Sequence, residues 1–382
     1  MKITLIGPIF PYKGGISHYT SLMAKNLMKE HNVDVVSFKL QYPKLLYKKP
    51  QKDFENDSFK IENVKYLLNS INPFSCFKTA NYIKKQFPDL IIFQWWHPFF
   101  SFCYWLLLKT LGKQNIIFLC HNVLPHEKFP FQEILTKSVL KKATAYILHS
   151  ETDENSLKEL IKLPLYKKTF LPTYNAFKIK NITQKEAREV LRIDENDEIL
   201  LFFGFIREYK GLKHLIRAIP IIRDKIPTCK LLIVGDFFEN NKSEYMALIK
   251  SINCGEIIKI IDGYIPDKEV EKFFVACDLM VCPYETATQS AVVQIAYDFE
   301  KPVIATSVGG LPEVVLNNET GYIVPPFDEK AITDAVVRYF ELNKAEEFTQ
   351  NIKKQTYKYS WDRMNETVLD LYSSFVKIKR KK

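Results

Sequence analysis

Short apolar runs alternate with longer amphipathic stretches along nearly the whole chain, and this alternation restricts the possible folds more than any other feature. The runs have the length of β-strands and few polar interruptions, as expected for strands buried on both faces. We expect strands at Lys2–Ile6, Val33–Phe38, Leu90–Gln94, Asn115–Leu119, Thr144–Leu148, Ile199–Phe203, Lys230–Val234, Ile257–Ile261, Leu279–Cys282 and Val303–Ala305. We expect helices between them at Ser17–Glu30, Phe77–Gln86, Phe102–Leu111, Phe131–Lys141, Leu212–Lys225, Glu244–Ile252, Lys268–Ala276 and Ala291–Phe299. Strands joined by helical crossovers predict an α/β protein with a parallel sheet in each half.

The length of 382 residues exceeds one ordinary core and suits two domains. A polar stretch with a proline, residues 171–182, is the best linker between two similar halves. We therefore predict two Rossmann-like domains, residues 1–175 and 176–382, that face each other across a cleft. The last helix, residues 361–378, is predicted to pack back on the first domain. Ligands of open parallel sheets bind at the carboxyl ends of the strands, so the residues just after each strand are the site candidates.

The formal net charge of +10 is unevenly distributed. Residues 1–175 hold 24 lysines, no arginine and 13 acidic residues, a net charge of +11, and the remaining 30 basic and 31 acidic residues leave −1. Two interpretations stay open. The lysines solubilise the surface, or they attract an anionic partner such as lipid headgroups, a phosphorylated acceptor or nucleic acid. Aromatic and basic residues are not interleaved as in a stacking platform, so we expect no nucleic-acid partner.

The sequence predicts neither a membrane span nor a disulfide framework. The most apolar stretch, residues 98–108, is about half as long as a spanning helix requires. The first residues run into a strand pattern without a signal-peptide pattern, so we expect a cytoplasmic protein. The seven cysteines form no C-x-x-C pair and are expected to be reduced and mostly buried.

Glycines follow the first strand of each half, and in the second half cations accompany them. Gly14 and Gly15 precede the first helix, where glycine lets backbone N–H groups approach a phosphate, although a plain turn has the same pattern. In the second half, Arg207 and Lys210 follow a glycine turn before a long helix. Such cations stabilise the charge that develops on a leaving diphosphate, and a solvated turn is the structural alternative.

A further polar segment precedes the expected helix at residues 291–299. Small residues at its start suit a diphosphate at a helix N-terminus, and Gln289 and Ser290 are the binding candidates there. Glu285 and Gln294 are candidates for hydrogen bonds to sugar or ribose hydroxyls. A buried amide satisfied by protein partners is the alternative for Gln294.

A histidine, His121, follows the strand at residues 115–119. It stands beside Asn122, with His126 five residues further on. Substrate hydrogen bonding, metal binding and a structural role are all compatible with this pattern, and we favour hydrogen bonding because no third metal ligand is evident. The sequence contains no compact D-x-D pair, so we expect neither a metal ion at a diphosphate nor a cofactor.

In this order, the motifs resemble the family-4 retaining glycosyltransferases of the GT-B fold, within the branch that elongates bacterial surface polysaccharides. The resemblance covers nearly the whole chain and rests on the segments 14–15, 121–127, 204–211, 283–297, 301–306 and 309–313. It implies that Gly14 and Gly15 lie near the donor phosphates and that His121 contacts the donor sugar. It also implies that Lys210 binds the diphosphate and that the nucleotide base lies near Tyr264.

Two features depart from the family pattern. The family arginine lies five residues before the lysine, where this chain has Phe205, and the nearest arginine lies three before it. The family also has two glutamates separated by seven residues, whose places are taken here by Ala287 and Ile295. Glu285 and Gln294 lie near these places but out of register.

The resemblance implies retaining transfer of a sugar from a nucleotide-diphosphate donor to a glycan or lipid-linked acceptor. No carboxylate nucleophile is evident, so we expect front-face attack in which the leaving phosphate accepts the acceptor's proton. The alternatives are a nucleotide-sugar 2-epimerase of the same architecture, a basic nucleic-acid-binding protein and a non-catalytic partner subunit.

The basic first half also predicts docking on an anionic membrane surface. Aromatic residues at 95–100 lead into the apolar stretch at 102–111, and a separate loop holds the lysines Lys44, Lys48, Lys49 and Lys52. Aromatic side chains with lysines suit a headgroup interface. The basic tail from Lys377 adds to this charge if the last helix packs on the first domain. The alternative is that Trp95 and Trp96 belong to the core.

Overall fold

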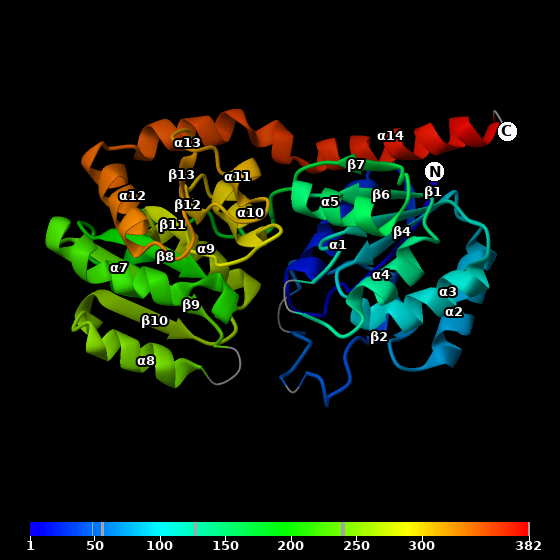
Figure 1. Ribbon diagram of the computed structural model, residues 1–382, viewed down its shortest axis with the longest axis horizontal. Helices are drawn as coiled ribbons and strands as arrows, with labels where there is room; N and C mark the ends of the chain where they lie inside the picture. The colour runs from blue at the N-terminus through cyan, green and yellow to red at the C-terminus, as the bar shows by residue number, and fades with distance from the viewer. Residues whose placement is uncertain (48, 55–56, 126–127, 238–240, 381–382) are drawn as a thin grey trace. The chain divides into compact units, whose positions relative to one another are not determined.

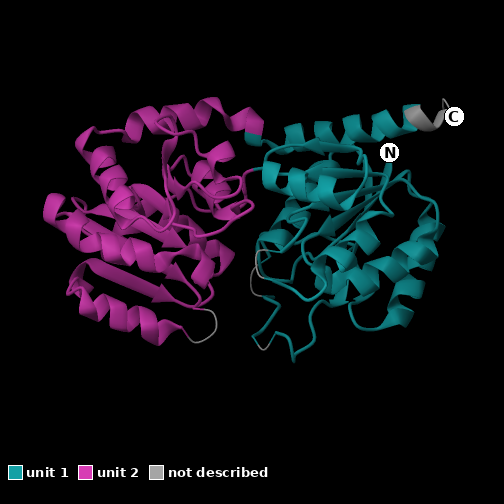
Figure 2. Ribbon diagram, viewed as in Figure 1, with its two compact units in different colours: residues 1–172, 359–382 teal, residues 173–358 magenta. Residues whose placement is uncertain are grey.

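The computed structural model describes residues 1–382 apart from 48, 55–56, 126–127, 238–240 and 381–382 (Figure 1). The chain divides into two compact units (Figure 2). Unit 1 comprises residues 1–172 and 359–382, and unit 2 comprises residues 173–358. The last segment of the chain therefore belongs to the same unit as the first.

The described part of unit 1 contains a seven-stranded parallel sheet in the order β3-β2-β1-β4-β5-β6-β7. Its strands are β1 (Lys2–Ile6), β2 (Asn32–Leu40), β3 (Lys65–Asn69), β4 (Leu90–Trp95), β5 (Ile116–Cys120), β6 (Ala145–Leu148) and β7 (Tyr166–Lys168). The residues of β4 and β5 are buried on both faces, which explains their nearly unbroken apolar sequences.

The helices of unit 1 are α1 (Gly15–Leu27), α2 (Pro73–Gln86), α3 (Ser101–Leu111), α4 (Gln132–Leu140), α5 (Glu151–Leu160) and α14 (Trp361–Arg380), with the 3₁₀ helix η1 (Pro98–Phe100). Helix α3 packs against both α2 and α4 (Figure 1). Helix α14 contacts α1, β6 and β7. Lys167 Nζ of β7 lies 3.0 Å from Asp370 Oδ2, and the rings of Tyr19 and Trp361 are 5.0 Å apart. The last helix thus completes the N-terminal unit.

The aromatic residues at the end of β4 lie in the core of unit 1. Trp95 and Phe100 are fully buried, and Trp96 is 7% exposed. Trp96 Nε1 donates to Tyr42 OH at 3.1 Å, and its ring packs edge-on against Phe38. Their side chains fill the apolar layer over the sheet and are unavailable to a membrane. That part of the docking prediction is wrong.

The lysine-rich loop after β2 keeps exposed apolar residues. Leu45 and Leu46 are 86% and 60% exposed. Lys48 of this loop lies outside the described residues, as do residues 381–382 of the basic tail. No helix among the described residues is long and apolar enough to cross a membrane. The seven cysteines are free thiols and buried, as the sequence predicts.

The described part of unit 2 forms a six-stranded parallel sheet in the order β10-β9-β8-β11-β12-β13. Its strands are β8 (Glu198–Phe203), β9 (Cys229–Gly235), β10 (Ile258–Asp262), β11 (Leu279–Cys282), β12 (Val303–Thr306) and β13 (Gly321–Val324). Its helices are α6 (Gln184–Leu191), α7 (Leu212–Lys225), α8 (Lys242–Ser251), α9 (Asp267–Ala276), α10 (Ala291–Asp298), α11 (Leu311–Val314), α12 (Glu329–Glu341) and α13 (Ala345–Lys354). Short 3₁₀ helices are η2 (Glu208–Lys210), η3 (Gly255–Ile257) and η4 (Thr356–Tyr359).

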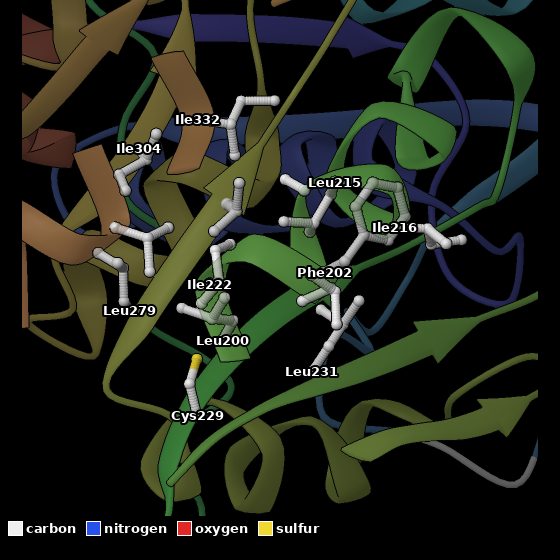
Figure 3. Close-up of a cluster of buried hydrophobic side chains, with 14 of the residues drawn as sticks. Leu200, Phe202, Leu215, Ile216, Ile222, Cys229, Leu231, Leu279, Ile304 and Ile332 are labelled. Carbon is white, nitrogen blue, oxygen red and sulfur yellow. The ribbon is translucent and has the colours of Figure 1, made fainter. Parts of the chain in front are cut away.

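Helix α7 covers one face of the unit 2 sheet through a continuous apolar layer. Figure 3 shows Leu200 and Phe202 of β8, Leu215 and Ile222 of α7 and Leu231 of β9 in this layer. All five are at most 1% exposed, and burial of each stabilises the fold by about 2 kcal/mol. This core fixes the strand ends from which the loops of the candidate site depart.

Candidate active site

Each sheet has one point at which the strand order reverses, here called its switch point. In unit 2 the chain runs from β8 outward to β10 and then returns to β11 beside β8; in unit 1 the reversal lies between β1 and β4. At such a point the loops leave in opposite directions and open a crevice at the carboxyl ends of the strands. We therefore expect ligand sites at the loops after β8 and β11 in unit 2 and at the loops after β1 and β4 in unit 1.

Lys210 lies in η2, after β8, and is 8% exposed. A Cβ added at Gly204 would stand 3.1 Å from Lys210 Nζ, which lies 5.7 Å from the centroid of the Tyr284 ring. Burial lowers the pKa of Lys210 to about 8; the Cys282 thiol opposes this shift, and the Arg207 guanidinium adds to it. An anionic ligand would favour the charged form that burial opposes.

Arg207 is half-buried at the start of η2, and its carbonyl oxygen accepts the Lys210 N–H at 3.1 Å. Its guanidinium helps to lower the pKa of Lys210, because like charges repel. Phe205, at the family position of the arginine, is also half-buried. The structure therefore gives Arg207 a place beside Lys210 from a different backbone position.

Glycines let the loops of this edge approach backbone to backbone. Gly211 has φ 62°, and a Cβ there would stand 2.0 Å from the carbonyl oxygen of Pro283. Gly309 has φ 53°, and a Cβ there would stand 1.8 Å from the carbonyl oxygen of Ala287. A side chain at either position would push the loops apart. The loops after β8 and β12 are thereby held against the loop after β11.

Glu285, in the loop after β11, is held by side chains of α7. Its Oε1 accepts hydrogen bonds from Lys213 Nζ at 2.8 Å and from His214 Nε2 at 3.0 Å. His214 Nδ1 in turn lies 2.8 Å from Glu329 Oε1. The carboxylate thus ties the loop to α7. Sequence reasoning missed Lys213 and His214, because their only signal is their place just after the Lys210 loop.

Gln294 of α10 is fully buried, and within the described residues neither its Oε1 nor its Nε2 has a hydrogen-bond partner. An amide satisfied by protein partners, the alternative left open by the sequence, is therefore wrong for the described residues. Ser290, which caps α10, lies with its Oγ 3.4 Å from Tyr284 OH. Gln289 Nε2 donates to Gly310 O at 3.4 Å. Both amide atoms of Gln294 can therefore still form hydrogen bonds with a ligand, whereas Nε2 of Gln289 is already engaged.

His121 of unit 1 directly follows β5. Its Nε2 lies 2.7 Å from Gln94 Oε1, its backbone N–H donates to Trp95 O at 2.8 Å, and the Tyr19 ring packs edge-on at 4.7 Å. Burial, and then the neighbouring His149, lower the pKa of His121 well below 6.5. The ring is therefore neutral near pH 7 and acts through hydrogen bonds.

Gln94 is fully buried at the end of β4, and its place requires Gly7. A Cβ at Gly7 would stand 2.5 Å from Gln94 Cγ and 3.2 Å from Thr20 Oγ1. Because an amide oxygen only accepts, Gln94 favours the tautomer with hydrogen on His121 Nε2 and leaves Nδ1 as an acceptor. Sequence reasoning missed Gln94, whose signal is a single polar residue inside an apolar strand.

The remaining candidates lie at the same sheet edges. Gly14 caps α1 with φ 103° and open space around a Cβ, and Gly15 is the exposed first residue of α1. Asn122 is half-buried. Tyr264 is half-buried after β10, two strands from β8. The predicted segment residues 126–127 lie outside the described residues.

In unit 2 the structure brings Arg207 and Lys210 to the switch point beside the loop that carries Glu285. In unit 1 it brings His121 to Gln94. Gly14 and Gly15, at the start of α1, follow β1, two strands from β5. Over the described residues, no group of three or more histidine, cysteine, aspartate or glutamate side chains is arranged to hold a metal ion.

Two family models match the chain in succession. Residues 13–172 match Glycosyltransferase Family 4, and residues 183–359 match Glycosyl transferases group 1. Together the two models cover most of the chain, which therefore belongs to the family-4 glycosyltransferases. Its fold is GT-B.

Named relatives agree with this assignment. The lipopolysaccharide 1,2-N-acetylglucosaminetransferase of Salmonella typhimurium is 27% identical over 191 residues, 48% of this chain and 50% of that protein. The capsular polysaccharide biosynthesis glycosyltransferase CapM of Staphylococcus aureus is 29% identical over 188 residues, 48% of each. The alignments thus span about half the length of these relatives. Among solved structures, Anabaena HepE in complex with UDP and glucose superposes with a TM-score of 0.76 at 16% identity, over 98% of this chain and 100% of that one.

Proposed function

We propose that this protein is a retaining glycosyltransferase that moves a sugar from a nucleotide-diphosphate donor to a glycan or lipid-linked acceptor in surface-polysaccharide synthesis. The observation that carries the proposal is Lys210, a buried cation with a pKa of about 8 at the switch point of unit 2. The polysaccharide enzymes among its relatives and the UDP complexes of its structural neighbours support the choice of donor and pathway.

Lys210 and Arg207 would stabilise the leaving diphosphate. Departure of the donor sugar builds negative charge on the phosphate oxygens, and positively charged groups fixed in advance lower the barrier most in a water-poor site. The same pair supplies two positive charges without a divalent cation, so we propose that transfer needs neither metal nor cofactor. Glycine at positions 204 and 211 keeps side chains away from this edge.

His121 would position the donor sugar through hydrogen bonds. Its neutral ring, fixed by Gln94, offers Nδ1 as an acceptor for a hydroxyl. Glu285 is engaged by Lys213 and His214 and is therefore a poor candidate for a nucleophile. This supports front-face attack, in which the leaving phosphate takes the proton of the acceptor hydroxyl and no covalent sugar–enzyme intermediate forms.

The test is a panel of nucleotide sugars, with UDP-glucose first because HepE binds it. Thermal shift measures donor binding, and slow release of free sugar and nucleoside diphosphate measures donor cleavage without an acceptor. Nuclear magnetic resonance of the released sugar shows whether the anomeric configuration is retained. Release of an epimerised sugar with no transfer would favour the 2-epimerase alternative. Binding of no member of the panel would contradict the proposal.

A further inference from the structure

One exposed face of unit 1 combines lysines with large apolar side chains. It is formed by α2, α3 and α4 with their adjoining residues, 71–87, 101–113 and 128–142, and is called the docking face below. Helix α3 packs between the other two (Figure 1). We propose that the docking face binds the surface of an anionic lipid bilayer. The inference deepens the proposed function, because it places the enzyme where a lipid-linked acceptor is presented.

The charge of the docking face is almost entirely of one sign. Its three segments hold one acidic residue, Glu133, and nine lysines: Lys78, Lys84, Lys85, Lys109, Lys113, Lys128, Lys137, Lys141 and Lys142. All nine are exposed except Lys142, which is half-buried. Each lysine near an anionic leaflet strengthens binding about fivefold. A surface with this imbalance repels a second copy of itself and fits an anionic partner.

Large apolar side chains stand among these lysines. Phe74 is 78% exposed, Phe102 58%, Phe131 77% and Ile134 69%. Trp105 is half-buried between two ammonium groups, with Lys109 Nζ 5.1 Å and Lys142 Nζ 5.9 Å from its ring. Apolar groups exposed to this degree gain free energy from insertion at a headgroup interface.

An exposed aromatic residue stands at the start of each of the three helices. Crossover helices run back along a parallel sheet, so α2, α3 and α4 all begin at the carboxyl ends of the strands, the end at which His121 lies. Phe74 and Phe102 belong to the first turns of α2 and α3, and Phe131 precedes α4. In contrast, the exposed Phe77 lies further along α2, and Phe87 caps its other end. Lysines follow in the last turns. A bilayer against this face would therefore meet apolar groups at the site end of unit 1 and, through Phe87, at the opposite end of α2.

The experiment is co-sedimentation of the full chain with vesicles of phosphatidylglycerol and phosphatidylcholine in equal parts, and with pure phosphatidylcholine. At low salt the protein should sediment with the anionic vesicles only, and high salt should release it. The variant Lys84→Gln/Lys113→Gln/Lys141→Gln should weaken binding about a hundredfold. Its charge-matched control, Lys162→Gln/Lys250→Gln/Lys330→Gln, removes three exposed lysines elsewhere and should bind like the wild type.

A second variant, Phe74→Ser/Phe102→Ser/Ile134→Ser, tests insertion, with Leu163→Ser/Leu342→Ser as its control. These side chains are exposed, so circular dichroism melts should match the wild type. The Phe74→Ser/Phe102→Ser/Ile134→Ser variant should lose vesicle binding, and the Leu163→Ser/Leu342→Ser control should keep it. Wild-type protein that stays in the supernatant, equal loss in the controls, or preferential binding to RNA at the same salt would each overturn the proposal. Turnover with a soluble acceptor is measured separately, so failure here leaves the proposed transfer untouched.

Discussion

Replacement of Lys210 by methionine should stabilise unit 2 and strongly lower turnover at the same time. Methionine keeps much of the length of the side chain and removes its charge. The pKa of Lys210 is about 8 in the folded protein, against an ordinary value of 10.5. One pKa unit corresponds to about 1.4 kcal/mol, so the buried ammonium costs the folded state roughly 3 kcal/mol at neutral pH.

The sign of this effect follows from the lowered pKa. The unfolded chain holds the proton more tightly than the folded one, so the cost is fully present below pH 8 and declines as pH rises from 8 to 10.5. The advantage of Lys210→Met over the wild type should therefore be largest at neutral pH and should vanish in strong alkali. Bound UDP should restore the proton, so UDP binding to the wild type should take up protons near pH 8.

The assay must report on unit 2. All four tryptophans, at positions 95, 96, 105 and 361, lie in unit 1. Their fluorescence therefore follows unit 1 in urea, and far-ultraviolet circular dichroism, which follows both units, gives the unfolding of unit 2 by difference. Lys250→Met, at an exposed position of α8, is the control and should change stability little. Turnover of Lys210→Met should fall about a hundredfold or more. A variant less stable than the wild type at neutral pH would show that the charge is compensated in the folded state and would refute the reasoning.

Three further outcomes are expected. His121→Ala should lower kcat more than nucleotide affinity, because His121 lies in unit 1 and the diphosphate-binding candidates Arg207 and Lys210 lie in unit 2. Isothermal titration measures the nucleotide affinity, and turnover is measured separately. Intact turnover with lost nucleotide affinity would contradict this prediction. Transfer should survive EDTA, and complete loss restored by magnesium or manganese would contradict the proposed charge pair. Gly7→Ala should destabilise unit 1 by about 2 kcal/mol in tryptophan-monitored unfolding and reduce kcat, because its Cβ displaces Gln94. Wild-type stability and wild-type kcat in Gly7→Ala would show that Gln94 accommodates the added Cβ without cost and would contradict this prediction.

The buried strands were predictable because burial on both faces forces a continuous apolar run. All ten predicted strands are present within two residues of their expected ends. The strands that the pattern does not predict are β3, β7 and β13, and all three lie at sheet edges. β3 has an exposed lysine and tyrosine before its two leucines, β7 consists of a tyrosine and two lysines, and β13 is only four residues long and begins with glycine. A short or half-covered strand carries too little apolar periodicity to be recognised.

The site was predictable only where one residue carries its own chemistry. Lys210 and His121 stand out as a cation and an imidazole after strands. Gln94 and His214 do not, because their importance lies in partners far away in the sequence, 27 residues for Gln94 and 71 for His214. The error on Trp95 has the same origin. An aromatic residue after a strand fits both a core and an interface, and only the packed neighbours decide between them.

This chain lacks the two family glutamates, and the side chains at their positions 287 and 295 have a different chemistry. Ala287 and Ile295, at their places, are 8% and 6% exposed and apolar, so neither can bond a hydroxyl. Successive residues of a helix point about 100° apart, so Gln294 cannot aim its amide where a side chain at 295 would point. Glu285 is likewise committed to Lys213 and His214. We therefore expect that Glu285 and Gln294 do not restore the family contacts. We expect the preference for one donor sugar to follow Gln294, whose amide has no hydrogen-bond partner among the described residues, rather than Glu285.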